Sequence, residues 1–339
     1  MSISDVGVMY IAEVSANHLG SLDRAKAIIR AASQSGATAV KLQTYTADTM
    51  TLDLPNLKIS NEHSLWGGKS LYQLYEEAHT PWNWHEELFD LALSLNLIPF
   101  SSPFDISAVD FLESLNAPMY KIASMETGDH QLIRAVAKTG KPLIVSTGAT
   151  ELGEIHELVD VIKSTGNEDF TLLVCTSSYP SHPRDSHINR ISTLKKIFNC
   201  KVGLSDHTLG IGASVAAVAL GATTIEKHMT LKRTDGGPDG AFSMEPEEFA
   251  SLVREGNTAR ESLGNSVWEM QPSENESRRL RRSLYIVRDV KKGERVSPEN
   301  VRSIRPGQGI PPKFLHSILG KTFSQDVSLG TPMKFEFVE

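Results

Sequence analysis

The sequence predicts an eight-stranded parallel α/β barrel, a (β/α)₈ fold, followed by a small second domain. Three observations carry this prediction. Short apolar, β-branched runs alternate with amphipathic segments through most of the chain, which is the pattern of parallel strands joined by crossover helices. Polar residues collect where those runs end. A polar, arginine-rich stretch then interrupts the alternation, and a short β-rich tail follows it.

The predicted strands are eight apolar runs of four or five residues, each typical of a buried strand. In chain order they are Met9–Glu13, Ala39–Gln43, Ile98–Ser101, Met119–Ile122, Leu143–Ser146, Leu172–Thr176, Val202–Ser205 and Thr224–His228. The helices predicted around them include Ser21–Ser35, Trp84–Leu95, Ile106–Leu115, His130–Lys138, Glu151–Ser164, Ile211–Leu220 and Glu245–Leu263. A doubly wound open sheet is the competing prediction. It usually has fewer strands and a glycine-rich phosphate turn after the first one, and residues 15–20 do not form such a turn.

One connection is unusually long: the segment from about Thr44 to Pro81, which follows the second strand and contains several aromatic residues. Loops of this length inside compact domains are usually lids or binding loops. In a barrel such a loop lies on the rim that carries the active site. The aromatic residues could equally pack the loop onto the barrel, and the sequence leaves both interpretations open.

The end of the chain predicts a separate small domain. We divide the sequence into a catalytic barrel of residues 1–270, a linker of residues 271–282 and a small domain of residues 283–339. The linker carries Arg278, Arg279, Arg281 and Arg282, which favours a solvated helix over an anion site. A domain of about 55 residues buries little surface on its own, so we expect it to dock on another surface.

Composition excludes several classes of protein. The 339 residues are 40% hydrophobic and 22% charged, with a net charge of −7, which is typical of a soluble globular protein and not of one that coats nucleic acid. The two cysteines, Cys175 and Cys200, do not form a disulfide framework and are expected to be reduced thiols. Neither a signal peptide nor a membrane-spanning run is recognisable. We therefore expect a cytoplasmic protein without a nucleic-acid or membrane partner.

The ends of the predicted strands carry the candidate chemistry. The polar residues there are Glu13, Lys41, Gln43, Ser101, Ser102, Lys121, Ser124, Glu126, Ser146, Thr147, Thr176, Ser177, Tyr179, Ser205, Asp206, His207, Glu226 and His228. Lysines and hydroxyls together suit a phosphate group, and carboxylates such as Glu13 and Glu126 suit proton transfer.

His207 and His228 end neighbouring strands, so they suit a shared divalent metal that keeps open positions. Each residue alone also has a plainer interpretation: a lysine that reaches solvent, a serine that caps a helix, or a structural histidine. No HExxH or CxxC pattern occurs, which argues against a zinc protease or a structural zinc site. The residues therefore predict a barrel enzyme that uses a metal and an anionic substrate, and they leave the reaction open.

Longer motifs narrow this prediction. They are Glu13–His18, Val40–Gln43, Tyr120–Glu126, Ser146–Gly148, Gly203–Thr208 and Glu226–His228. In that order, and nearly end to end, the chain resembles the nonulosonic (sialic) acid synthase family. Residues 304–310 resemble that family's C-terminal SAF domain, an antifreeze-like β-clip fold. Residues 65–72, 77–82 and 175–180 resemble the pseudaminic acid branch, whereas N-acetylneuraminate synthases have a different long loop and often an asparagine at about Ser177. Leu19 departs from the asparagine common at its position in the family.

The resemblance implies that phosphoenolpyruvate condenses with 2,4-diacetamido-2,4,6-trideoxy-β-L-altropyranose, with release of phosphate. It implies that His207 and His228 bind Mn²⁺ or Mg²⁺. Glu126 would transfer a proton at C2 of phosphoenolpyruvate, and Glu13 would be the proton partner of the departing phosphate. The phosphate and carboxylate would be held by Lys41, Lys121, Ser124, Ser146 and Ser205.

The resemblance assigns the sugar's hydroxyls to Asp239, and the remaining substrate-binding residues are Gln43, Ser102, Ser177 and Tyr179. It also implies a homodimer in which Arg305 reaches from the small domain into the barrel of the partner subunit. Three alternatives remain: a synthase of N-acetylneuraminate or legionaminic acid, a metal-dependent hydrolase on the same barrel, and a non-enzymatic sugar-binding protein.

Overall fold

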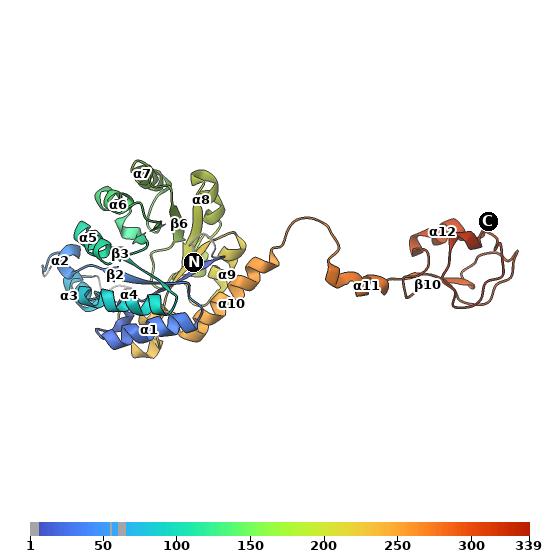
Figure 1. Ribbon diagram of the computed structural model, residues 1–339, viewed down its shortest axis with the longest axis horizontal. Coiled ribbons are helices and arrows are strands. Elements are labelled where there is room, and N and C mark those ends of the chain that lie inside the picture. The colour runs from blue at the N-terminus through green and yellow to red at the C-terminus, as the bar shows by residue number, and fades with distance from the viewer. Residues whose placement is uncertain (1–6, 55, 60–65) are drawn as a thin grey trace. The chain divides into compact units, whose positions relative to one another are not determined.

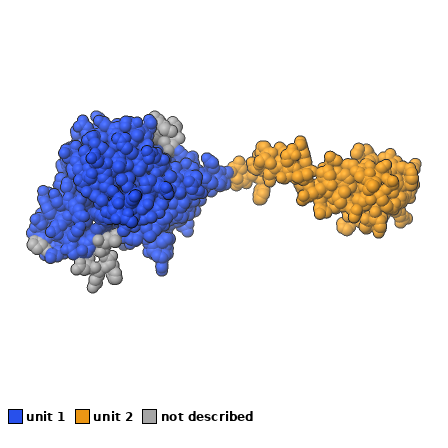
Figure 2. All heavy atoms as spheres, turned by 90° about the horizontal axis from the view of Figure 1, so that it is seen from below, with its two compact units in different colours: residues 1–264 blue, residues 265–339 orange. Residues whose placement is uncertain are grey.

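The computed structural model describes residues 7–54, 56–59 and 66–339. The chain forms two compact units, divided between Gly264 and Asn265 and coloured separately in Figure 2. Leu65, the first residue of one motif in the long loop, lies outside the described residues.

The first unit is a closed barrel of eight parallel strands, as the sequence predicts (Figure 1). The strands are β1 Met9–Glu13, β2 Ala39–Thr44, β3 Ile98–Pro103, β4 Tyr120–Ile122, β5 Leu143–Ser146, β6 Phe170–Cys175, β7 Lys201–Ser205 and β8 Thr224–His228. The barrel closes because β8 pairs with β1, so that Glu13 lies opposite His228. The open-sheet alternative is therefore wrong.

Helices form an outer layer around the strands (Figure 1). They are α1 Leu22–Gln34, α4 His85–Ser94, α5 Ile106–Ser114, α6 His130–Ala137, α7 Leu152–Lys163, α8 Arg190–Phe198, α9 Gly212–Ala219 and α10 Pro246–Ser262. Their apolar faces pack on the outside of the strands in one large core. A smaller cluster around Ile11, Phe100 and Leu173 fills the inside of the barrel. Glu13 is two residues beyond Ile11 on β1, so its side chain points to the same face of the strand. It lies above the apolar cluster, at the polar C-terminal end of the barrel.

The long segment after β2 is folded rather than open. It contains α2 Ala47–Met50 and α3 Leu71–Ala78, neither of which the sequence analysis identified. Ser70 caps α3 in a reciprocal pair with Gln73, each bond 3.1 Å long. Beyond α3, Trp82 stacks on Phe111 with ring centroids 4.7 Å apart. This aromatic residue therefore packs the end of the segment onto the barrel.

The second unit, residues 265–339, has its own small core. It contains α11 Asn275–Arg279, an antiparallel pair of β9 Ser283–Ile286 and β10 Val301–Ile304, and α12 Leu315–Ile318. Leu284, Phe323 and Met333 are fully buried in its core. Arg305 follows β10 directly and is exposed. Within the described ranges, no helix combines the length and apolar character needed to cross a membrane.

Candidate active site

A cavity of about 480 Å³ opens at the C-terminal ends of the barrel strands. Eleven of the fifteen residues to which the sequence analysis gave a catalytic, substrate-binding or metal-binding role line it: Lys41, Gln43, Lys121, Ser124, Glu126, Ser146, Tyr179, Ser205, His207, His228 and Asp239. They come from separate strands and loops, and the parallel arrangement brings all of them to one end of the barrel.

The bottom of this cavity is a group of four buried ionisable side chains, Glu13, Lys41, Lys121 and Glu226, here called the charged floor. The Lys41 ammonium nitrogen lies 3.1 Å from Glu13 Oε2 and 3.1 Å from Glu226 Oε2. Lys121 Nζ lies 3.8 Å from Glu226 Oε1, to which Ser205 also donates a hydrogen bond of 3.1 Å. The two positive and two negative charges compensate one another, which is what burial requires.

The two carboxyl groups of the charged floor ionise differently. Burial raises the pKa of Glu13 to about 7, against the nearby Lys41 ammonium. Burial acts on Glu226 as well, but Lys121 and Lys41 outweigh it and hold the pKa of Glu226 at about 2. Glu226 is therefore the permanent anion, and Glu13 can exchange a proton near neutral pH.

Glu126 is a second carboxyl group suited to proton transfer. It ends the short 3₁₀ helix Ser124–Glu126 after β4, and its Oε2 atom is buried without a hydrogen-bond partner. Burial raises the pKa of Glu126 to about 7, with Lys121 opposing. A carboxyl group with such a pKa can act as acid or base at physiological pH.

The histidine pair lies beside the charged floor, with ring centroids 5.4 Å apart. His207 Nδ1 lies 2.9 Å from the Thr176 carbonyl oxygen, so this nitrogen carries the proton and Nε2 keeps its lone pair. Burial lowers the pKa of His228 well below its usual value, and its Nδ1 atom is buried without a hydrogen-bond partner.

These two imidazoles fit a divalent metal as a partial ligand set. A neutral buried ring with an unpaired nitrogen and a second ring oriented through a backbone carbonyl are the features of metal-binding histidines. Asp239 Oδ2 lies 3.7 Å from His228 Nδ1. Residues 7–54, 56–59 and 66–339 contain no cluster of three or more His, Cys, Asp or Glu that could hold a metal. An ion bound here would take further ligands from water or substrate, as catalytic metals do.

The hydroxyl groups of Ser124 and Ser177 converge on Gly148. The Gly148 amide donates a hydrogen bond of 3.0 Å to Ser124 Oγ. A Cβ atom at Gly148 would lie 2.3 Å from Ser177 Oγ and 2.8 Å from Ser124 Oγ, so only glycine allows these hydroxyls to converge. The nearby Ser146 Oγ is buried without a partner. Together with the Lys121 ammonium, free hydroxyls of this kind suit an anion.

Asp239 is connected to the charged floor through hydrogen bonds. Ser15 Oγ donates to Asp239 Oδ2. Gln43 Nε2 donates to both Ser15 Oγ and Glu13 Oε1, each at 3.0 Å. Burial raises the pKa of Asp239. This carboxyl group and Gln43 offer hydrogen bonds to a polar ligand next to the histidines.

The long segment forms one side of the cavity through Trp66, Leu71, Leu74 and Tyr75, here called the loop wall. Trp66 Nε1 donates a hydrogen bond of 2.8 Å to the Pro238 carbonyl oxygen, and its ring lies 5.8 Å from that of Tyr179. The aromatic residues of the segment thus do both things that the sequence left open: Trp82 packs on the barrel, and Trp66 and Tyr75 line the cavity.

The other four residues that were given such a role do not line the cavity. Glu13 lies beneath it in the charged floor, in contact with Lys41. Ser177 Oγ lies next to Gly148, 2.3 Å from where a Cβ atom would be. Ser102 Oγ is buried in β3 without a hydrogen-bond partner. Arg305 belongs to the second unit.

The structure also adds residues to which the sequence analysis assigned no role. Glu226 was placed at the rim, and its counter-ion role depends on two lysines from distant strands, which no local pattern reveals. Tyr45 and Ser15 line the cavity too. Tyr45 directly follows β2 and Ser15 comes two residues after β1, so their positions at strand ends were a usable signal. Cys175, expected to be a plain buried thiol, lines the cavity with its sulfur 4.0 Å from His207 Nδ1.

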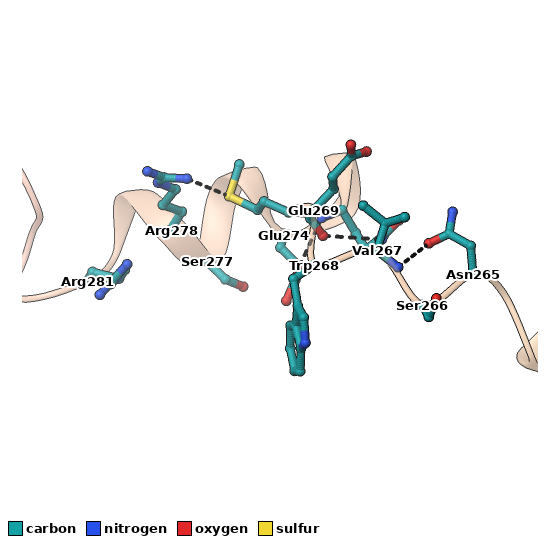
Figure 3. A pocket seen from close by; sticks show the side chains of 11 residues that line it. Asn265, Ser266, Val267, Trp268, Glu269, Glu274, Ser277, Arg278 and Arg281 are labelled. Carbon is teal, nitrogen blue, oxygen red and sulfur yellow. Dashed lines mark hydrogen bonds between the residues drawn. The ribbon is translucent and has the colours of Figure 1, made fainter.

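A larger hollow of about 910 Å³ runs along residues 265–281 of the second unit (Figure 3). Arg278 donates to the Met270 sulfur there at 3.1 Å, and the Trp268 side chain is fully exposed. The hollow contains no buried ionisable group, so the barrel cavity is the candidate site.

Comparisons with known proteins agree with both units. The NeuB family matches residues 28–268, and the SAF domain matches residues 281–339. Pseudaminic acid synthase of Campylobacter jejuni is 42% identical over 331 residues, which cover 98% of this chain and 96% of the relative. N,N'-diacetyllegionaminic acid synthase of Legionella pneumophila is 36% identical, over 99% of this chain and 96% of the relative.

A solved structure leads to the same fold. The N-acetylneuraminic acid (sialic acid) synthetase of Leptospira borgpetersenii, crystallised with citrate, superimposes with a TM-score of 0.73 at 31% sequence identity. The match covers 82% of this chain and 94% of that protein. Sequence and structure comparisons therefore agree on the barrel.

Proposed function

The chain belongs to the NeuB family, and from this membership we propose that it is a pseudaminic acid synthase. It condenses phosphoenolpyruvate with 2,4-diacetamido-2,4,6-trideoxy-β-L-altropyranose and water, giving pseudaminic acid and phosphate. The observation that carries the proposal is the juxtaposition, in one cavity, of the charged floor, the serine hydroxyls around Gly148 and the histidine pair. Identity of 42% to a pseudaminic acid synthase, against 36% to a legionaminic acid synthase, favours this acceptor.

The lysines and serines bind phosphoenolpyruvate. Lys41 and Lys121 supply positive charge, and the hydroxyls of Ser124, Ser146 and Ser205 accept and donate hydrogen bonds at the phosphate and carboxylate oxygens. Glu226 keeps both ammonium groups in place when no substrate is bound, since it lies within 4 Å of each. Held in this way, the enol carbon C3 faces the acceptor.

The reaction forms one carbon–carbon bond and breaks one carbon–oxygen bond. C3 of phosphoenolpyruvate attacks the aldehyde carbon of the open-chain sugar. Water adds to C2 and loses one proton to Glu126, and that proton passes on to the former aldehyde oxygen, which becomes a hydroxyl group. The bond between C2 and the phosphate oxygen then breaks, and phosphate leaves with a proton from Glu13. The C2 hydroxyl group left by the water becomes the ketone carbonyl of the product, and its proton returns to Glu13. Both carboxyl groups have a pKa of about 7, which permits gain and loss of a proton near neutral pH.

A divalent cation, Mn²⁺ or Mg²⁺, held by His207 and His228 would supply Lewis-acid polarisation of the acceptor aldehyde. Asp239, Gln43 and Tyr179 contact the sugar, since all three line the cavity beside the histidines. Ser102 and Ser177 support this set from behind the lining.

The active enzyme is a homodimer in the cytoplasm, in which the SAF domain of one subunit covers the barrel of the other. Two features support this arrangement. Arg305 is exposed on the small unit, and the apolar side chain of Met125, which lines the cavity, is 67% exposed. Mixing the inactive variants Arg305→Ala and His207→Ala should restore activity, because a mixed dimer contains one barrel with both residues. Absence of restored activity in verified mixed dimers would contradict the exchange.

The acceptor is tested by following phosphate release with phosphoenolpyruvate, Mn²⁺ and one sugar at a time. We expect release with the altrose derivative. Release only with N-acetylmannosamine would identify an N-acetylneuraminate synthase, and release only with 2,4-diacetamido-mannose a legionaminic acid synthase. Phosphoenolpyruvate labelled with ¹⁸O at the C2–O bridge should deliver its label to phosphate. Label retained in the sugar acid would exclude C–O cleavage.

A further inference from the structure

The two metal-binding histidines of the proposed function are each preceded by a charged residue that faces away from the cavity. The sequences are Ser205-Asp206-His207 at the end of β7 and Glu226-Lys227-His228 in β8. Side chains alternate between the two faces of a strand. Because the histidines and Glu226 line the cavity, Asp206 and Lys227 point outward, toward the helical layer.

Asp206 and Lys227 form an ion pair there, with Lys227 Nζ 3.0 Å from Asp206 Oδ2. Each side chain is only 1% exposed. Burying two charges this deeply costs free energy unless their remaining polar atoms are also hydrogen-bonded. The other hydrogen bonds of Asp206 and Lys227 show which parts of the backbone the pair holds.

All three protons of the Lys227 ammonium group have an acceptor. Besides Asp206, Lys227 Nζ donates to the carbonyl oxygens of Thr208 at 2.7 Å and Gly210 at 3.0 Å. An ammonium group has three donors and no further capacity. Lys227 therefore ties β8 to the turn that leaves His207, at two points of its backbone.

Both oxygens of the Asp206 carboxylate also accept hydrogen bonds. Its Oδ1 atom accepts from the Thr208 amide at 2.8 Å, and its Oδ2 atom accepts from Ser214 Oγ of α9 at 2.6 Å as well as from Lys227. The backbone amide of Asp206 donates to the Glu226 carbonyl oxygen at 2.9 Å. The carboxylate thus fixes the turn around His207 to both β8 and α9.

The C-terminal ends of β7 and β8 are therefore connected on both faces of the sheet, next to His207 and His228. On the cavity side, Ser205 Oγ donates to Glu226 Oε1 at 3.1 Å. On the outer side, Asp206 and Lys227 form the ion pair. We propose that Asp206 and Lys227 are positioning residues, which hold His207 and His228 at the separation and orientation that one divalent cation requires.

This inference rests on the proposed function, because it assumes that the histidine pair binds the metal. Partners behind metal-binding histidines typically contribute 10-fold to 100-fold in metal affinity. The metal affinity of the full-length protein is therefore the quantity to measure, by calorimetric titration with Mn²⁺ alone, without either substrate.

The central variant is Lys227→Met, which keeps the chain length and removes the three donors. We expect the Kd for Mn²⁺ to rise by about 10-fold to 100-fold. The matched control is Lys201→Met at the opposite end of β7, which breaks the half-exposed pair of Lys201 and Asp169, 3.3 Å apart. The control should leave the Kd unchanged within about twofold.

Lys227→Met leaves Asp206 as an unpaired buried charge, which destabilises the fold, so Ser214→Ala provides a second measurement. It removes one hydrogen bond from Asp206 and leaves both charges paired. We expect a Kd about 3-fold to 10-fold higher than that of the wild type, from the same second-layer effect. A purely structural role would instead lower the melting temperature of either variant and leave the Kd for Mn²⁺ unchanged, and that result overturns the proposal.

His207→Ala distinguishes a failure of the positioning role from a failure of the proposed metal site. If His207→Ala abolishes Mn²⁺ binding but Lys227→Met and Ser214→Ala bind as tightly as the wild type, only the positioning role is wrong. If His207→Ala itself binds Mn²⁺ normally, the metal site is wrong and the positioning role is wrong with it.

Discussion

The charged floor and the loop wall face the same cavity but are built in opposite ways. The four side chains of the floor come from β1, β2, β4 and β8 and are at most 5% exposed. Those of the wall come from a single connection, and Trp66, Leu71 and Tyr75 are only half-buried. The floor is fixed by the hydrogen-bonded ladder of the barrel, whereas the wall depends on a few contacts such as the bond from Trp66 to Pro238.

This difference suggests a division of labour. A buried set of charges tolerates almost no substitution, because removing one leaves another unpaired. A half-buried apolar surface can change shape without such a penalty. We therefore assign the reaction common to sugar acid synthases to the floor, and the choice of acceptor to the wall.

The largest expected effect comes from removing the permanent anion of the floor. Glu226→Gln keeps the size of the side chain but leaves Lys41 and Lys121 without their shared partner. We expect a loss of about 3 kcal/mol in the free energy of unfolding and a fall of more than about 100-fold in kcat/KM for phosphoenolpyruvate, since the lysines repel each other. Urea denaturation measures the free energy of unfolding, and the rate of phosphate release gives kcat/KM.

The matched control for that variant lies in the segment that carries the wall. Glu77→Gln breaks the exposed ion pair with Lys69 and should change the free energy of unfolding by less than about 1 kcal/mol. Equal losses in the two variants would contradict the contrast between floor and wall.

A smaller effect is expected at Gly148, which lies against two serine hydroxyls of the proposed phosphate site. Gly148→Ala brings a methyl group within 2.3 Å of Ser177 Oγ and 2.8 Å of Ser124 Oγ, so both hydroxyls must turn away. We expect the KM for phosphoenolpyruvate to rise about 10-fold, equivalent to the loss of one hydrogen bond to a charged group, and the KM for the sugar to change little. Gly153→Ala in α7, where a Cβ meets nothing within 4 Å, is the control. A rise in the sugar's KM alone would place the phosphate elsewhere.

The charged floor and the loop wall also differ in how far the sequence predicts them. The barrel strands were predictable because a buried parallel strand is a continuous apolar run, and Met9–Glu13, Leu143–Ser146 and Thr224–His228 have the bounds predicted for them. Residues at strand ends, such as Lys41 and His207, follow from that pattern alone. The counter-ion role of Glu226 does not, because it arises only when three strands distant in sequence meet.

The wall was harder to predict for a different reason. Its helix α3 is short, and the Ser70 cap with Gln73 is the only local signal for its start. Trp66 and Trp82 look alike in the sequence, yet one lines the cavity and the other stacks on Phe111. Which aromatic residue faces which surface depends on the path of the loop, and that path is set by tertiary contacts.

A moderate and selective effect is expected from the wall. Trp66→Ala removes the hydrogen bond to Pro238 and the contact with the Tyr179 ring. We expect kcat/KM for the sugar to fall about 10-fold to 100-fold, as for the loss of a buried aromatic contact with a hydrogen bond. The KM for phosphoenolpyruvate should stay within about twofold, because the groups proposed to bind it belong to the floor and the serines. Trp66→Phe keeps an aromatic ring but loses the hydrogen-bond donor. Its kcat/KM for the sugar should lie between the values of the wild type and of Trp66→Ala. Equal changes for both substrates would show that the wall is not specific to the acceptor.

The last expected effect is a pH dependence of stability with opposite signs at two residues that adjoin these regions, His85 and Glu126. His85 joins the ends of the long segment, since its Nε2 lies 2.8 Å from Thr44 Oγ1 and its Nδ1 3.3 Å from the Pro81 carbonyl oxygen. Burial lowers the pKa of His85 to about 4. Its contribution to stability is therefore complete above the unfolded pKa of 6.5 and is lost as the pH falls toward 4.

Glu126 beside the floor behaves in the reverse manner. Burial raises its pKa from 4.5 to about 7, so its contribution is complete below 4.5 and is lost as the pH rises through 7. Urea midpoints of the wild type, His85→Gln and Glu126→Gln between pH 4.5 and 7.5 separate the two. Relative to the wild type, His85→Gln should lose less stability on going from pH 7.5 to pH 5, by about 2 kcal/mol. Glu126→Gln should lose less on going from pH 5 to pH 7.5. If both variants shift the profile in the same direction, the two regions do not differ electrostatically, and the contrast between floor and wall is one of shape alone.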